Sequence, residues 1–304
     1  MKAFRTRWPA LAMVLFAAVA CRGETGESTS FDGEKAMEYA SAQLAFGPRI
    51  PGTAAATKAG DWIVSEMEKR ADTVMVQTWT HQTEDGKQLP MRNILARFNP
   101  HATQRILYVT HWDTRPRSDG AESPADRLLP VPGANDGASG VAMFMALGDA
   151  LKKNPVTAGV DLLFVDGEDY GQFDEKLADV LIGAAFFVKN PPEPGYRPIF
   201  GVLWDMIGDR DLRFLREGYS LEQAPEVVER VWSKAAELGY ASVFVQTDTG
   251  GITDDHVPFL KAGYRMIDVI DLEYPDHHRP TDTIDKISAK SLSIVGAVAE
   301  ALLR

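Results

Sequence analysis

The sequence has one cysteine, Cys21, in 304 residues, so a disulfide within the chain is excluded. Positive charge is also scarce: 32 Lys and Arg face 43 Asp and Glu, which leaves a net charge of −11. This balance lacks the basic surface that nucleic-acid binding requires, so no nucleic-acid partner is expected. Gly-x-Ser-x-Gly and phosphate-binding P-loop motifs are absent as well, which argues against serine-nucleophile and nucleotide-phosphate chemistry.

The first 21 residues have the layout of a secretory signal. Lys2, Arg5 and Arg7 precede an apolar stretch from about residue 10 to 19, which is too short for a comfortable transmembrane helix. Cys21 follows Ala-Val-Ala, an order that resembles a bacterial lipobox although Ala18 stands where Leu is usual. We therefore expect residues 1–21 to be a signal peptide of an exported, periplasmic protein. A lipid on Cys21 would be its membrane anchor, and plain cleavage of the signal is the alternative.

The next segment, residues 22–32, is polar and rich in Gly, Ser, Thr and Glu, so we expect a flexible tether. Residues 33–304 then alternate between helical and strand patterns without internal repeats. Apolar residues recur at helical spacing in residues 34–46, 55–70, 137–151, 177–190, 224–239 and 288–304. Runs typical of strands occupy residues 73–79, 92–98, 105–110, 159–167, 198–208, 242–247 and 264–271, with 81–90 as a loop.

This alternation predicts one α/β domain with three α/β/α layers and a mostly parallel, mixed central sheet. Binding sites in such sheets lie beyond the carboxyl ends of the strands, so polar residues that directly follow apolar strands are candidates. Five segments provide them: His111 to Thr114, Asn135-Asp136, Asp166 to Asp169, Asp205, and Asp276 to His278. Each segment alone is more typical of a turn or a helix cap. Their convergence on one edge of the sheet favours a site.

The chemistry of this predicted site follows from its residue types. Several carboxylates crowded together repel one another unless a cation neutralises them or some are protonated. Histidine mixed with Asp and Glu, without thiolates, suits catalytic zinc with an open coordination position. Adjacent Glu168 and Asp169 suit a division of labour in which one carboxylate binds metal and its neighbour is a general base. A surface lipoprotein that keeps the fold only for binding is the alternative, and absence of bound zinc would favour it.

Five motifs, "HWDT", "GANDGASG", "DGEDYG", "WDMIG" and "HHRPTDT", resemble in order those of the M28 zinc-peptidase family. The resemblance begins near Gly47 and covers nearly all of the chain beyond it. It implies a zinc exopeptidase-like fold, with residues 33–304 as a zinc-dependent catalytic domain. The superfamily offers two main activities: aminopeptidases with two zinc ions, and glutaminyl cyclases with one.

The resemblance also assigns roles to individual residues. It implies that Asp136, Asp169 and His278 bind zinc and that Glu168 is the general base. The family usually has Glu at the position of Asp169, so this chain departs from the pattern there. His111 and Asp205 would complete a second zinc site in an aminopeptidase, but cyclases resemble that arrangement while they bind one zinc.

The substrate pocket shows a second departure. His277 stands where cyclases carry a tryptophan, and Tyr274 stands where another aromatic residue is expected. Trp112 and Trp204 flank site residues, so they either line the pocket or belong to the core. The loop at residues 115–135 is long enough for a lid, and its arginines could attract peptide carboxylates, although a plain exposed loop is equally compatible.

Two features favour the cyclase branch. The run at residues 92–114 resembles the cyclase sequence that leads to the metal loop. Asp254 also resembles the cyclases, because aminopeptidases commonly have Ser there; its implied role is to share a proton with Glu168 and Asp205. The expected reaction is therefore conversion of an N-terminal glutamine of peptides or proteins to pyroglutamate with loss of ammonia. A di-zinc aminopeptidase is the alternative.

Overall fold

The computed structural model describes Met1, residues 29–173 and residues 176–304. Apart from Met1, the expected signal peptide and residues 22–28 of the expected tether lie outside the described residues. Within the described part, no helix has both the length and the apolar character needed to cross a membrane.

The central sheet has six strands in the order β1-β2-β4-β3-β5-β8. Strands β4, β3, β5 and β8 are parallel, whereas β2 pairs antiparallel with both β1 and β4. The prediction of a mostly parallel, mixed sheet is therefore confirmed. The strands span Thr73–Gln82 (β1), Gln88–Phe98 (β2), Arg105–His111 (β3), Gly159–Val165 (β4), Phe200–Asp205 (β5) and Met266–Ile270 (β8).

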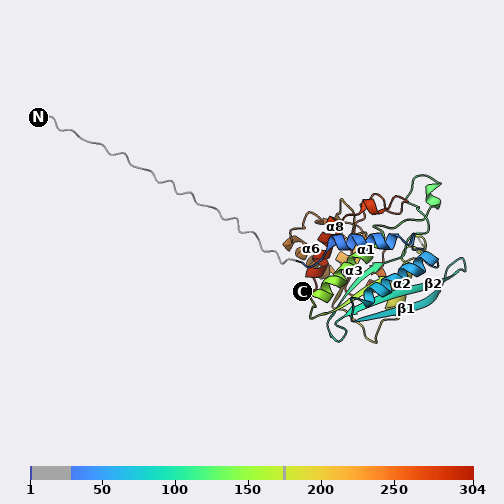
Figure 1. Cartoon of the computed structure of the whole chain (residues 1–304), viewed down its shortest axis with the longest axis horizontal. Coiled ribbons are helices and arrows are strands. Elements are labelled where there is room, and N and C mark those ends of the chain that lie inside the picture. Colours follow the sequence, from blue (N-terminus) through green and yellow to red (C-terminus); the bar gives the residue numbers. More distant parts are fainter. Residues whose placement is uncertain (2–28, 174–175) are drawn as a thin grey trace.

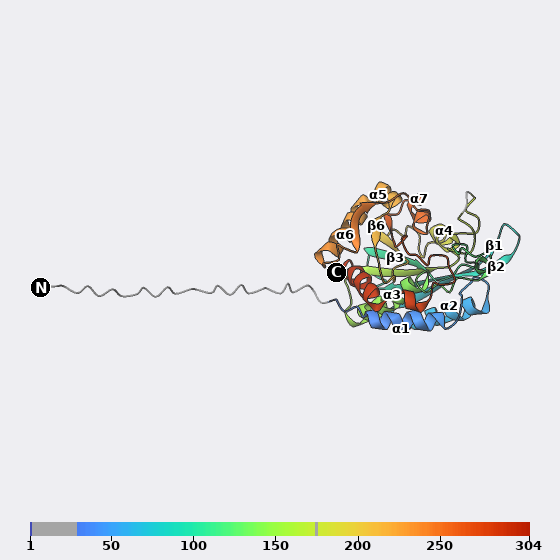
Figure 2. The same cartoon turned by 90° about the horizontal axis from the view of Figure 1, so that it is seen from above.

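Helices cover both faces of this sheet and complete three layers (Figures 1 and 2). One face carries α1 (Gly33–Leu44), α2 (Ala54–Glu68), α3 (Ala138–Lys153) and α8 (Ala289–Ala301). The other face carries α4 (Ile182–Lys189) and α7 (His256–Lys261). Packed near β8 are α5 (Gly218–Gln223), α6 (Pro225–Glu237) and a small parallel sheet of β6 (Phe214–Arg216) and β7 (Phe244–Asp248), and two short 3-10 helices span Asp126–Leu128 and Ile284–Lys286.

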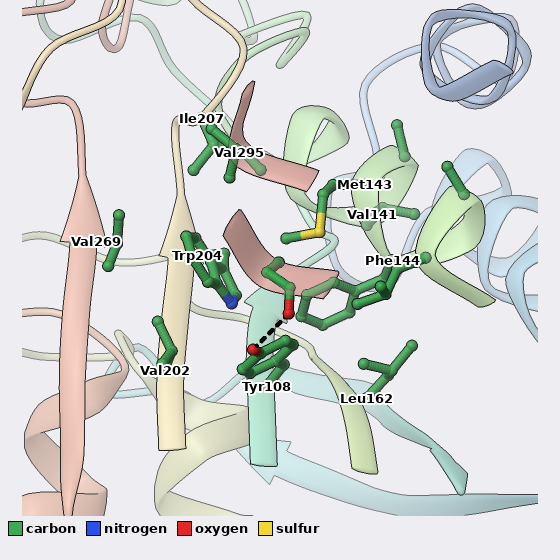
Figure 3. Close-up of a cluster of buried hydrophobic side chains, with 14 of the residues drawn as sticks. Tyr108, Val141, Met143, Phe144, Leu162, Val202, Trp204, Ile207, Val269 and Val295 are labelled. Carbon is green, nitrogen blue, oxygen red and sulfur yellow. Dashed lines mark hydrogen bonds between the residues drawn. The ribbon is translucent and has the colours of Figure 1, made fainter. Parts of the chain in front are cut away.

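The larger core lies between the sheet and the layer of α1, α3 and α8. Tyr108 and Trp204, on neighbouring strands, pack edge to face at 5.6 Å, and the Tyr108 hydroxyl donates to the Ala299 carbonyl (Figure 3). Because side chains alternate along a strand, Leu107 and Leu203 instead face the second core under α4 and α7. Continuous burial of β3 to β5 on both faces fixes the edge from which the site residues project.

The two ends of α3 mark opposite sides of the molecule. Its N-terminus follows Asp136, whereas its C-cap, Asn154, lies in a surface hollow with Ser30 and Glu300. Ser30 donates to the Glu300 carboxylate from its backbone N–H at 2.8 Å and from its hydroxyl at 2.7 Å. Ser30 thus lies near the C-terminal end of α3, and this 16-residue helix, about 24 Å long, separates that end from Asp136.

Three expected elements differ in the structure. Half of the expected loop at residues 81–90 is strand, because β1 and β2 form a continuous hairpin closed by a turn at residues 83–87. The expected helix at residues 177–190 begins only at Ile182. Residues 177, 179 and 181 have positive φ, and the Leu181 N–H donates to the Glu168 carbonyl, which ties this segment to the site instead. Strand β7 pairs with β6 and not with the central sheet.

Candidate active site

The structure brings the predicted site residues together at the carboxyl ends of the parallel strands. His111 ends β3, Glu168 follows β4, and Asp205 ends β5, while other segments reach the same edge from loops. A cavity of about 480 Å³ opens there. Its walls are Asp136, Glu168, Phe173, Leu177, Asp205, Ile252, Thr253, Asp254, Ile270, Leu272, His277 and His278.

Asp136 lies between two histidines. Its Oδ1 is 3.1 Å from His111 Nε2, and its Oδ2 is 3.7 Å from His278 Nε2. Gly137 fixes this position, since its φ is +98° and a Cβ there would lie 2.7 Å from the Asp113 carbonyl oxygen. Asp136 Oδ2 is buried and has no hydrogen-bond partner within the described part of the chain. An acceptor left in this way fits a position at which a cation binds.

Two groups of potential metal ligands share Asp136. His111 and Asp205 belong to one group, and His277 and His278 to the other; within each group the ligand atoms lie within 4.8 Å of one another. His111 Nε2 is also 3.1 Å from Asp205 Oδ1. Mixed imidazole and carboxylate donors around a cavity suit a catalytic metal centre. The described residues therefore contain a candidate metal site.

Asp169 belongs to neither of these groups. Its Oδ1 is 3.3 Å from His278 Nε2, but the same oxygen accepts a hydrogen bond from Arg115 Nη1 at 2.5 Å. Both side chains of this ion pair are almost fully buried, at 1% and 2% exposure. Oδ2 of Asp169 has no hydrogen-bond partner among the described residues. The role of Asp169 as a metal ligand stays a prediction, and the Arg115 guanidinium would compete with a metal ion for its carboxylate.

The second ring nitrogen of His278, Nδ1, contacts the carboxylate of Asp119. Asp119 Oδ1 lies 3.4 Å from His278 Nδ1, and the Gly120 N–H donates to the His278 carbonyl at 3.0 Å. Burial lowers the pKa of His278, but the charges of Asp169 and Asp119 outweigh it and raise the pKa to about 10. The residue has φ of +53°, an unusual conformation outside glycine. A carboxylate on one ring nitrogen leaves the other directed at the cavity, as in many metal-binding histidines.

A network of backbone hydrogen bonds fixes the loops that carry these residues. The Asp113 carboxylate accepts from the N–H groups of Glu168 at 3.1 Å and Asp169 at 3.2 Å. The Asp282 carboxylate accepts from the Asp136 N–H, and it also receives the Tyr274 hydroxyl at 2.6 Å. Each acid joins segments that are far apart in the sequence, so the site geometry is set by pairs of loops.

Burial and neighbouring charges raise the pKa values of two acids in the cavity wall. Burial, reinforced by the charge of Asp169, raises the pKa of Glu168 well above its usual value. Burial and the charge of Asp205 raise the pKa of Asp254 to about 8. Asp254 is 3% exposed, and one of its oxygens has no hydrogen-bond partner among the described residues. At neutral pH Asp254 therefore holds a proton, while the raised pKa of Glu168 makes its carboxylate a stronger proton acceptor than an exposed glutamate.

The loop that bears Asp254 is anchored by a second buried cluster. His256 Nε2 lies 3.3 Å from Glu217 Oε2, and Asp255 is fully buried beside it in the sequence. Glu217 caps α5 by accepting from the N–H groups of Tyr219 and Ser220, and it accepts from the Ile252 N–H at 2.8 Å. This carboxylate thus joins α5 to the cavity wall.

Replacing Glu217 with Gln is expected to lower the free energy of unfolding by about 2–3 kcal/mol at pH 7, since buried N–H donors lose a charged acceptor. Although burial raises the pKa of Glu217, hydrogen bonds from His256 and Ser220 lower it to about 2. The stabilisation that the Glu217 carboxylate provides is therefore complete above its pKa in the unfolded chain, about 4.3. It is lost as the pH falls toward 2. Urea unfolding should show a smaller difference in the free energy of unfolding between variant and wild type at pH 4 than at pH 7. Exposed Glu222→Gln, on the same helix, is the matched control; an equal gap at both pH values would contradict this account.

The pocket wall differs from the one considered from the sequence. Trp112 and Trp204 are buried in the core, at 2% and 0% exposure, and neither lines the cavity. Trp112 packs against the layer of α2 and donates from Nε1 to the Arg92 carbonyl. Tyr274 is buried too, with its hydroxyl on Asp282. His277 does line the cavity, and the remaining wall is apolar, from Phe173, Leu177, Ile252, Ile270 and Leu272.

Arg115 and Asp119 are site residues that the sequence did not assign. Arg115 is not available to attract substrate carboxylates, because it is 2% exposed and pairs with Asp169 and Asp119. The loop at residues 115–135 therefore supports His278 through this chain of charges. The only sequence signal was an arginine and an acid four residues apart directly after "HWDT".

The chain is similar to glutaminyl cyclases and to an aminopeptidase precursor. The crystal structure of Porphyromonas gingivalis glutaminyl cyclase superposes with a TM-score of 0.87 at 36% identity, over 91% of this chain and 99% of that chain. A leucine aminopeptidase precursor from Bacteroides thetaiotaomicron gives a TM-score of 0.87 at 34% identity, over 90% of this chain and 97% of that chain. The glutaminyl-peptide cyclotransferase of Drosophila melanogaster is 26% identical over 278 residues, 82% of this chain and 75% of that protein.

The model of peptidase family M28 matches residues 93–303, which include all the strand ends described above. That match contains His111, Asp136, Glu168, Asp205 and His278 in one continuous stretch. With these side chains gathered at one cavity and the fold shared over nine tenths of its length with family structures, this chain belongs to peptidase family M28.

Proposed function

We propose that this chain is a zinc-dependent glutaminyl-peptide cyclotransferase that converts the N-terminal glutamine of peptides to pyroglutamate. The observation that carries the proposal is buried Asp254 in the wall of the cavity that also holds Glu168 and Asp205. Aminopeptidases of the family commonly have Ser at this position, so an acid here resembles the cyclases, and cyclisation must move a proton from an amine to a departing ammonia. Similarity to a cyclase structure over 91% of this chain, and to a cyclase sequence over 82% of it, supports the same choice.

In the proposed reaction the α-amine of glutamine attacks its own γ-carbonyl carbon, and the bond to the side-chain nitrogen breaks. Glu168 takes the proton released by the attacking amine and returns one to the leaving nitrogen, which departs as ammonia. Asp254 and Asp205 hold a shared proton beside Glu168. Asp136 and His278 would hold zinc, which when bound supplies Lewis-acid polarisation of the γ-carbonyl. The apolar wall confines the side chain in its cyclising conformer.

The test is a mass measurement on a Gln-Phe peptide incubated with purified protein. We expect a product lighter by one ammonia, with no free amino acid released. An acetyl-Gln-Phe peptide, which lacks a nucleophilic amine, should remain unchanged and serves as the control. Release of free N-terminal residues from Gln-Phe and Leu-Phe peptides would overturn the proposal in favour of an aminopeptidase.

A di-zinc aminopeptidase is the second candidate, because a second donor group is present. His111, Asp136 and Asp205 gather within 4.8 Å, and a leucine aminopeptidase precursor is similar at 34% identity. Elemental analysis of the purified protein separates the two candidates. One zinc per chain supports the cyclase, and two zinc ions would favour the peptidase.

Asp254→Ser is expected to lower turnover by about 10–100-fold with little change in KM, since it removes a proton-sharing partner and not a binding contact. Asp254→Asn keeps the size of the side chain without its acidity, so it should show a similar loss. Steady-state kinetics on a Gln-Phe substrate would measure both. If KM rises while kcat is unchanged, Asp254 shapes the pocket and has no part in proton transfer.

We also propose that the protein is exported to the periplasm and anchored through a lipid on Cys21. The basic start, the short apolar stretch and the small residues before Cys21 support this proposal. In a bacterial host, the wild type should incorporate a labelled fatty acid and the Cys21→Ser variant should not. Release of unlabelled wild type in soluble form would point to plain cleavage.

A further inference from the structure

His277, at the position where the sequence resemblance gives cyclases a tryptophan, lies beside His278 in the cavity wall. Its ring centroid is 3.8 Å from that of His278, and both side chains line the cavity. Together with Asp136 they form a group whose ligand atoms lie within 4.8 Å of one another. Two imidazoles and one carboxylate are a common donor set of catalytic zinc, which leaves one position open.

Asp169 is correspondingly less suited to bind the metal directly. Arg115 Nη1 lies 2.5 Å from its Oδ1, in a buried ion pair. A cation that used this carboxylate would have to share it with a guanidinium charge in a site with little water to screen it. Aspartate is also one methylene shorter than the glutamate that the family usually has there. Consistent with this, Asp169 lies outside both groups of ligand atoms found among the described residues.

We propose that His277 is a zinc ligand in this chain, with Asp136 and His278 as its companions. Asp169 is then a positioning residue: it anchors Arg115, which holds Asp119 against Nδ1 of His278, the ring nitrogen that does not bind the metal. A single carboxylate ligand leaves the bound cation with a net positive charge, so it polarises a carbonyl more strongly than one neutralised by two carboxylates. The imidazole at position 277 thus takes the place, as a metal ligand, of the carboxylate that the family usually provides at position 169.

The inference depends on the zinc binding assumed in the proposed function, but not on the reaction. Zinc K-edge absorption spectra of the zinc-loaded full chain count imidazole ligands through their multiple-scattering signal. We expect two imidazoles in the wild type and one in His277→Trp and His277→Ala. Competition with a chromogenic chelator should show an affinity for zinc that is lower by about tenfold or more in both variants. Circular dichroism of the metal-free variants reports whether they fold.

Two controls sharpen the test. His101→Ala removes a histidine from an exposed loop and should keep both the zinc affinity and the spectrum. Asp169→Asn should keep two imidazoles. One imidazole in the wild type, or unchanged affinity in both His277 variants, overturns the inference while the cyclase proposal stands. A wild type that binds no zinc overturns both proposals together.

Discussion

Glu168→Gln is expected to lower turnover by about 10²–10⁴-fold and to leave the zinc content unchanged. Glutamine has nearly the same shape but cannot accept the proton of the attacking amine. The residue lines the cavity, and burial with the charge of Asp169 raises its pKa well above the usual value, so its carboxylate is a stronger base than an exposed glutamate. Kinetics on a Gln-Phe peptide and elemental analysis of the same preparation provide the two readouts.

Exposed Glu222→Gln is the matched control for that experiment and should retain wild-type activity. The paired readout separates a proton carrier from a ligand, because the loss of a ligand would remove zinc together with activity. If Glu168→Gln retained turnover within a few-fold of wild type, the proton would have to travel by another acid, with Asp254 as the next candidate.

Asp136→Asn is expected to remove bound zinc and to lower activity by about 10³-fold or more, since several kcal/mol of Lewis-acid stabilisation depart with the ion. Asp136 is shared by both groups of potential ligands, at 3.1 Å from His111 and 3.7 Å from His278. The result should therefore be the same whether the chain binds one zinc or two. Elemental analysis and peptide kinetics measure it.

Its control is Asp211→Asn, which changes an exposed acid in the same way. Circular dichroism of both variants tests whether the fold is intact. An Asp136→Asn protein that still binds stoichiometric zinc would show that the metal lies elsewhere in the chain.

The local sequence pattern predicts much of the fold, but it does not predict the pairing of strand β7. Buried strands such as β3 to β5 are continuous apolar runs, and their order along the chain predicts a parallel sheet. Strand β7 is instead mostly exposed and ends in polar residues, and it pairs with β6 outside the main sheet. Its partner is three residues long, so no periodicity in that segment could have indicated the pairing.

The choice for Trp204 between the pocket wall and the core, which was left open, follows from the periodicity of its strand. Side chains alternate along a strand, so Trp204 must point away from Asp205, and an acid in the cavity places its neighbour in the core. Arg115 and Asp119 are different, because their roles arise from contacts with residues more than fifty positions away in aperiodic loops. No local rule predicts such contacts.

The hydrogen bonds from Ser30 to Glu300 have a practical consequence for any attached form of this protein. They hold the start of the described chain at the C-terminal end of α3, while Asp136 lies at the other end of that helix. A support joined directly at Thr29, whether a bilayer or a chromatography bead, would be attached near the end of α3 that lies farther from Asp136. Immobilised enzyme should therefore meet large polypeptide substrates as freely as enzyme in solution.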